Sequence, residues 1–387
     1  MKKNLLLLLL LALSVYAIAQ DPAQVKLMQE LNAHPQQDIS RVNLLNEMAF
    51  YKLNEKIYNE AFDISVKIGY SAGEAYALTY IAFSKFINNY RKEGDSLFRR
   101  ADSIAKKTAS LDLLATVQVY HGYATLYEDS KIGLTLLLEA EKTVERSGNK
   151  KLLALCQHFI AIEYANGQSD IPKGMEYYLK SIKTAEEVNY LRFICAGYIS
   201  IGGLYNRIDD KANAILYYQK AREANKQFKS PAIDGRLLIH EGNEYEKAGR
   251  YTESIDAFKK ALKISSEADS GLIVSIQMNL AEVYNRTDSL SLAFKYAISS
   301  VNYAKRKGDD LLYASAVMPL SENYLKNKMP DSAIYYAKLG YDYSKRIGAV
   351  EVMRDNAEAL TMPTYIRRTL QMPIVIICYL SITGTAY

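Results

Sequence analysis

Apolar and small residues recur at a period of about 40 residues along most of this 387-residue chain. In each copy an aromatic residue is usually followed by a small residue nine positions later, a large one after thirteen and a small one after sixteen. One copy reads Tyr245, Ser254, Phe258 and Ala261. The aromatic positions, separated by 41, 41, 40, 39 and 40 residues, are Tyr123, Tyr164, Tyr205, Tyr245, Tyr284 and Tyr324. A fixed period in this range indicates a repeat architecture.

Each repeat is predicted to be a pair of antiparallel helices, the first ending near the aromatic residue, and to contact only its neighbours. After Tyr123 and Tyr164 the connection is one residue longer. Gly69, Gly148 and Gly308 follow the second helices, where a left-handed residue ends a helix. No useful length of chain alternates as a strand does. The pattern predicts an all-α solenoid with eight helix pairs over residues 38–348.

The segment EGNEYEKAGRYTESIDAFKKALKIS, residues 241–265, resembles a tetratricopeptide repeat (TPR). Six copies match well, and two earlier ones have Lys52 and Lys85 in the aromatic position. The resemblance implies a right-handed superhelix of helix pairs, although the usual TPR period is 34 residues. Long repeats of this kind resemble the arrays of exported signalling proteins common in Bacteroidetes-type bacteria. In those proteins a membrane helix and a histidine-kinase or DNA-binding output domain follow the array.

The first residues have the pattern of an export signal, predicted over residues 1–19. Lys2 and Lys3 precede a short apolar run, and Ala17 and Ala19 form a small-x-small cleavage site. We expect cleavage after Ala19, a lead-in over residues 20–37, and a periplasmic or secreted protein. The run is too short for a durable membrane span.

The pattern changes after Leu360. Residues 349–360 read as the start of a ninth repeat, but Pro363 and Pro373 fall where its helices should run. We expect residues 361–387 to be an aberrant, poorly ordered tail that arose by a one-nucleotide frame change. No transmembrane span is expected in this chain.

The composition and charge of the chain reduce the range of possible functions. The chain is 49% hydrophobic and 24% charged, as is typical of a soluble globular protein. Its formal charge of +5, or +3 without Lys2 and Lys3, is weak and not clustered, so no nucleic-acid partner is expected. Cys156 and Cys195 are predicted to be buried free thiols, because packed helix axes are too far apart for a disulfide.

No catalytic constellation stands out. The four histidines are scattered and lack the spacing of metal ligands, and no glycine-rich phosphate loop occurs. We therefore expect no enzyme activity, cofactor or metal.

In TPR arrays the first helices line the concave face, which implies a protein or peptide ligand in that groove. Asn243 and Asn279 match asparagines that bind the ligand backbone in peptide-clamping TPR domains. The cationic positions of that clamp hold Ile239, Ser315 and Pro319 in this chain, which argues against binding of a carboxylate. The predicted peptide-binding residues are His121, His158, Asn206, Arg207, Arg236, His240, Asn243, Glu246, Asn279, Glu282, Asn285, Arg286 and Glu322.

The sequence thus favours an exported, non-catalytic TPR scaffold that binds a protein or peptide. The first hypothesis is a truncated sensory ectodomain of a signal-transduction protein. The second is a free-standing periplasmic assembly or scaffold factor, and the third is a glycan- or small-ligand-binding module. Oligomeric state and partner identity are left open.

Overall fold

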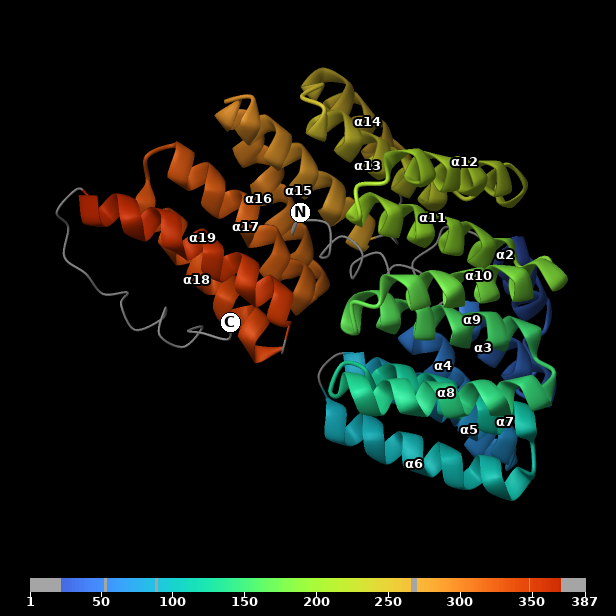
Figure 1. The fold of residues 1–387 in the computed structure, drawn as a ribbon. Helices are drawn as coiled ribbons and strands as arrows, with labels where there is room; N and C mark the ends of the chain where they lie inside the picture. Colours follow the sequence, from blue (N-terminus) through green and yellow to red (C-terminus); the bar gives the residue numbers. More distant parts are fainter. Residues whose placement is uncertain (1–21, 52–53, 88–89, 266–269, 348, 370–387) are drawn as a thin grey trace. The chain divides into compact units, whose positions relative to one another are not determined.

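A computed structural model describes residues 22–51, 54–87, 90–265, 270–347 and 349–369 (Figure 1). All regular elements within these ranges are helical. The predicted signal peptide at 1–19 lies outside the described residues, and so does the end of the predicted tail, 370–387.

The chain forms two compact units that divide after Leu237. Helix α13 spans this division. The first unit, called unit 1, contains the helices α2 (Pro22–Ala33), α3 (Ile39–Tyr51), α4 (Glu55–Ile68), α5 (Ser71–Ile87), α6 (Arg91–Thr108), α7 (Leu111–Thr125), α8 (Ser130–Ser147), α9 (Lys150–Ile162), the π-helix η2 (Glu163–Gly167), α10 (Ile171–Glu187), α11 (Leu191–Arg207), α12 (Lys211–Phe228) and the start of α13 (Pro231–Lys247).

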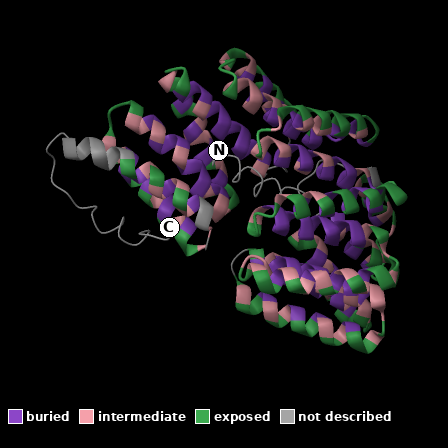
Figure 2. Ribbon diagram, viewed as in Figure 1, coloured by how far each residue is buried: buried purple, intermediate pink, exposed green. Residues whose placement is uncertain are grey.

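Unit 2 begins at Leu238, inside α13. Its further helices are α14 (Tyr251–Ile264), α15 (Ser270–Arg286), α16 (Leu290–Lys307), α17 (Asp310–Lys326), α18 (Pro330–Arg346) and α19 (Val350–Thr369). In each unit the buried residues form stripes along the helices (Figure 2). Such stripes are expected when each helix packs against its neighbours.

Helices α3 to α18 follow one another as first and second helices of successive pairs, which confirms the all-α, TPR-like fold class. The recurring aromatic residues lie near the ends of first helices, as Tyr205 does in α11 and Tyr284 in α15. Two features were not expected. Helix α2 lies in the predicted lead-in, and α19 continues beyond Leu360 to Thr369.

Small residues on the first helices receive large residues from the second helices. A Cβ placed on Gly242 of α13 would lie 2.5 Å from Cε1 of Phe258 on α14. The same relation holds in unit 1, where a Cβ on Gly202 would lie 2.5 Å from Cε1 of Tyr218. Phe258 is fully buried. Glycine therefore lets the two helices of a pair approach closely while the ring fills the space between them.

Three of the recurring tyrosines have equivalent ring partners in their repeats, whereas Tyr245 has Ala257 at the partner position. Tyr205 stacks on Tyr217 with ring centroids 5.5 Å apart, and Tyr284 stacks on Tyr296 at 5.7 Å. Tyr324 and Tyr336 repeat the arrangement at 5.3 Å. Each pair joins the end of a first helix to the second helix that follows it. This ring pair accounts for part of the heavy use of tyrosine.

Three second helices end at the glycines predicted to terminate them. Gly69, Gly148 and Gly308 end second helices with φ of 71°, 75° and 68°, the left-handed region that glycine adopts without strain. The extra residue after Tyr164 is accommodated by the π-helix η2, in which the wider turn uses one more residue than an α-turn.

Candidate functional site

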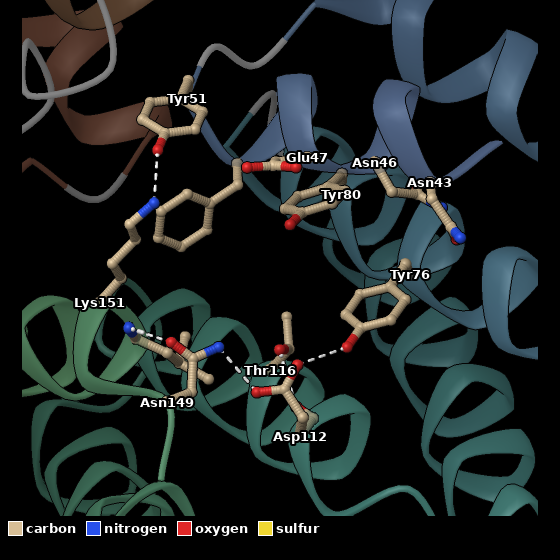
Figure 3. A pocket seen from close by; sticks show the side chains of 12 residues that line it. Asn43, Asn46, Glu47, Tyr51, Tyr76, Tyr80, Asp112, Thr116, Asn149 and Lys151 are labelled. Carbon is tan, nitrogen blue, oxygen red and sulfur yellow. Dashed lines mark hydrogen bonds between the residues drawn. The ribbon is translucent and has the colours of Figure 1, made fainter. Parts of the chain in front are cut away.

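Unit 1 contains a cavity of about 320 Å³ lined by the first helices of its first four pairs (Figure 3). Helices α3, α5 and α7 supply most of its wall, and the start of α9 completes it. Aromatic side chains form one part of the lining: Phe50, Tyr51, Tyr76 and Tyr80. The polar part includes amides, two carboxylates and one lysine: Asn43, Asn46, Glu47, Asp112, Thr116, Asn149 and Lys151.

Asp112 is held in place by two neutral donors. The Tyr76 hydroxyl donates to Oδ2 at 2.7 Å, and Nδ2 of Asn149 donates to Oδ1 at 2.7 Å. Burial, together with the nearby Asp112 carboxylate, raises the pKa of the Tyr76 phenol well above its usual range. Tyr76 is therefore a donor at any physiological pH. Because neither donor carries a charge, the carboxylate is oriented without being neutralised.

Tyr51 closes the cavity at the end of α3. Its hydroxyl accepts a hydrogen bond from Nζ of Lys151 at 3.0 Å, and its backbone carbonyl accepts one from Nη1 of Arg192 at 2.9 Å. Phe50 stacks on Tyr190 with centroids 6.4 Å apart. The first pair thus contacts the fourth and fifth pairs. The expectation that each repeat contacts only its neighbours is wrong for unit 1.

Two residues of the cavity, Asn46 and Glu47, have side-chain oxygens that can accept further hydrogen bonds. Nδ2 of Asn46 donates to the Gly73 carbonyl at 3.1 Å, while its buried Oδ1 accepts no hydrogen bond from any residue that the structure describes. Glu47 is exposed, and no described residue forms an ion pair with it. In Figure 3 Glu47 and Asp112 lie on opposite walls, and Lys151 is turned toward Tyr51.

Two predicted site residues of unit 1, His121 and Arg207, make contacts inside the repeat stack. The ring of His121 stacks on Phe98 of the second helix α6, with centroids 4.8 Å apart. Arg207 donates to the Ala165 carbonyl at 2.9 Å. In unit 2 Lys326, two residues after its aromatic position as Arg207 is, donates to the Asn285 carbonyl at 2.6 Å. This recurrence assigns Arg207 a role in joining successive repeats.

His158 is buried rather than exposed on a groove, with 1% of its surface accessible. Its ring meets those of Tyr178 and Phe193 edge to face. Burial, with the charges of Arg236 and Arg192, lowers the pKa of His158 to about 3. Arg236 is buried as well, at 3%, and Asn206 is half-buried. His158 and Arg236 therefore present almost no surface to a ligand in this structure.

In unit 2 the structure brings together most of the predicted residues. Nδ2 of Asn279 lies 3.4 Å from Oδ1 of Asn243. Nε of Arg286 lies 2.6 Å from Glu246, and its Nη2 lies 2.9 Å from Glu282.

The carboxylates around Arg286, which include Glu322, act against its partial burial and raise the pKa of its guanidinium. These residues form a polar strip along the first helices α13, α15 and α17. Whether it contacts a ligand stays a prediction.

Three predicted residues of unit 2 are buried: Asn279 at 8% exposure, Asn285 and His240. Asn285 has no accessible surface, and its Nδ2 donates to the carbonyl of Pro319 at 3.3 Å. Its Oδ1 accepts from Asn323 at 2.9 Å. Asn285 therefore supports helix α17 at its internal proline. His240 is 6% exposed.

The described part of the chain offers no group of three or more His, Cys, Asp or Glu residues that could hold a metal ion. Within the same residues, no helix combines the length and the apolar character needed to cross a bilayer.

The sequence-based prediction does not include the cavity, because the predicted groove residues begin at His121 in the third repeat. Groove positions lie nine and six residues before the aromatic position of a repeat. In the two weaker copies, these positions before Lys52 are Asn43 and Asn46, and the one nine residues before Lys85 is Tyr76. All three line the cavity. The signal was present, but the missing aromatic residue obscured it.

No protein-family model matches the chain, and neither does any curated protein sequence. Solved structures do resemble it. A Rap protein complexed with Competence and Sporulation Factor matches with a TM-score of 0.52 and 12% identity, over 93% of this chain and 99% of that one. The apo form of the quorum sensor NprR from B. thuringiensis matches with a TM-score of 0.50 and 16% identity, over 80% and 84%.

A signal transduction ATPase with numerous domains (STAND) from Pyrococcus horikoshii, which has a TPR sensor, matches with a TM-score of 0.53 and 17% identity. The match covers 85% of this chain but only 52% of that protein. At these identities the likeness shows the fold alone, and that fold is a TPR-like helical repeat.

Proposed function

We propose that this chain is a non-catalytic TPR-like scaffold that binds a protein or peptide segment through its first helices. The observation that carries the proposal is the unit 1 cavity, because side chains from four first helices converge on one space. Its volume of about 320 Å³ is at the lower end of ligand pockets. A space of this size fits side chains of an extended segment and is too small for a folded element.

Two further observations support this proposal. A Rap protein of similar fold has been solved complexed with Competence and Sporulation Factor, and the STAND neighbour carries its repeats as a sensor. The amino-terminal pattern of the chain supports export to the periplasm. A sensory ectodomain of a signal-transduction protein is the role that joins these properties.

The test is a selection from a library of displayed 12-residue peptides with blocked ends. Asn43 is exposed at the cavity, so Asn43→Trp fills its mouth without disturbing the core. Ile132→Trp places the same ring on the second helix α8, at a residue that is 55% exposed. We expect the wild type to enrich peptides that Ile132→Trp retains and Asn43→Trp loses.

A third variant, Asn243→Ala/Asn279→Ala, tests the polar strip of unit 2 in the same assay. Loss of binding only in this variant would move the site to that strip. Failure of the wild type to enrich any peptide would contradict the proposed function.

A further inference from the structure

We infer that the unit 1 cavity takes the basic side chain, lysine or arginine, of a bound peptide. The inference rests on the proposed function and specifies the chemistry of its site. It depends on the charges, the aromatic walls and the unused acceptors of the cavity.

The charges of the lining favour a cation. Among the described lining residues two carry a negative charge, Glu47 and Asp112, and one, Lys151, carries a positive charge. No described residue forms an ion pair with either carboxylate. Lys151 donates to the Tyr51 hydroxyl and faces the rings of Tyr51 and Tyr190, at 5.7 and 5.9 Å from their centroids. The lysine is thus held at the aromatic rim, and the charged groups of the lining sum to a net negative charge.

The geometry of Asp112 suits an incoming N–H group. Tyr76 and Asn149 each use one of its oxygens, and a carboxylate has about four acceptor sites. The remaining lone pairs can accept from an ammonium or guanidinium group. Hydrogen bonds of this charge-assisted kind are roughly twice as strong as neutral ones.

The aromatic walls favour the same ligand. Phe50, Tyr76 and Tyr80 line the cavity beside the two acids. A cation within about 6 Å of a ring centroid is attracted to the face of the ring. The position of Lys151 over Tyr51 shows this interaction inside the same site. The apolar stem of a lysine or arginine would also pack against these rings.

Asn46 supplies an independent observation. Its side chain lines the cavity and is 6% exposed, and its Oδ1, which is itself buried, accepts no hydrogen bond from a described residue. An amide oxygen is only an acceptor, so a donor is needed to satisfy it. An acidic or purely apolar side chain supplies no such donor, whereas a basic one does.

The experiment uses the peptides that the wild-type chain selects from the blocked library. The inference predicts that one position of these peptides is enriched in lysine or arginine. Replacing that lysine by Nε-acetyl-lysine, which keeps the length and removes the charge, should weaken binding about tenfold, equivalent to about 1.4 kcal/mol. A second arm with free amino termini shows whether a terminal ammonium substitutes for the side chain.

Glu47→Gln removes one charge while keeping the shape of the side chain. This substitution should also weaken the binding of lysine-containing peptides about tenfold. Its matched control is Glu139→Gln, an exposed carboxylate on the second helix α8, which should leave affinity unchanged. Equal affinity of Glu47→Gln and wild type would overturn the inference.

The two proposals fail in different ways. Selected peptides that lack an enriched basic residue, yet lose binding with Asn43→Trp, would overturn the basic-side-chain inference and leave the scaffold function standing. Enrichment of a free amino terminus in place of a side chain would overturn the stated source of the cation. The absence of any selected peptide would contradict both proposals.

Discussion

Replacing Gly242 by alanine tests the close approach of the two helices in a repeat. The added Cβ would lie 2.5, 2.8 and 2.9 Å from Cε1, Cδ1 and Cζ of Phe258. Because Phe258 is fully buried, its ring cannot move aside without shifting the residues packed around it. Overpacking of this kind costs about 1–3 kcal/mol, and three ring atoms in contact place it near the upper end. Alanine regains up to about 1 kcal/mol of helix propensity. The expected net destabilisation is about 2 kcal/mol.

Gly271→Ala is the matched control in the same unit. A Cβ at Gly271 of α15 would meet no atom within 4 Å, so this substitution should stabilise by up to about 1 kcal/mol. Urea unfolding followed by circular dichroism gives the global effect. Hydrogen exchange of α13 and α14 shows whether the loss is local, because opening in repeat proteins need not be two-state.

A double variant identifies the cause. Phe258→Leu should remove much of the collision, so Gly242→Ala should cost less in that background by about 1–2 kcal/mol. The packing argument would be refuted if Gly242→Ala were as stable as the wild type, or if its cost were the same with and without the Phe258→Leu substitution.

Two further predictions concern buried titratable groups. The pKa of His158 is about 3 in the folded chain and about 6.5 in the unfolded chain. As the pH falls, the unfolded state therefore binds a proton before the folded state does. The contribution of this group to the free energy of unfolding is present above pH 6.5 and is lost as the pH falls toward 3. From pH 7 to 5 this group should remove about 2 kcal/mol, and His158→Gln should show a correspondingly smaller loss in urea titrations; equal losses would contradict the assignment. Burial raises the pKa of Cys195 to about 12 and that of Cys156 well above its usual range. In a variant whose third cysteine is removed by Cys378→Ser, neither buried thiol should react with a disulfide reagent until urea unfolds the chain. Rapid labelling of the folded protein would show that these thiols are accessible.

The repeat architecture could be predicted from the sequence because its signals are local and repeated. Gly242 and Phe258, or Tyr205 and Tyr217, are close in the chain, and the same packing requirement recurs in each copy. The signals for helix ends are local as well. Gly69 ends α4 in the left-handed region, and at the start of α12 the side chain of Asp210 accepts a hydrogen bond from the backbone N–H of Asn213 at 3.1 Å.

The site could be predicted only in part. Contacts such as that of Tyr51 with Lys151 and Arg192 join residues 100 and 141 positions apart, and no period indicates them. Position within a repeat also does not give burial. Asn243 and Asn285 both lie at predicted groove positions, but Asn285 is held inside between α15 and α17.

The first helices of unit 1 are the proposed binding face, and both proposals depend on this placement. Its most direct test is hydrogen exchange of the full chain with and without a peptide selected from the library. We predict slower exchange in the first helices α3, α5, α7 and α9, with no change in the second helices α4, α6 and α8. Protection confined to the second helices, or no protection in unit 1, would contradict it.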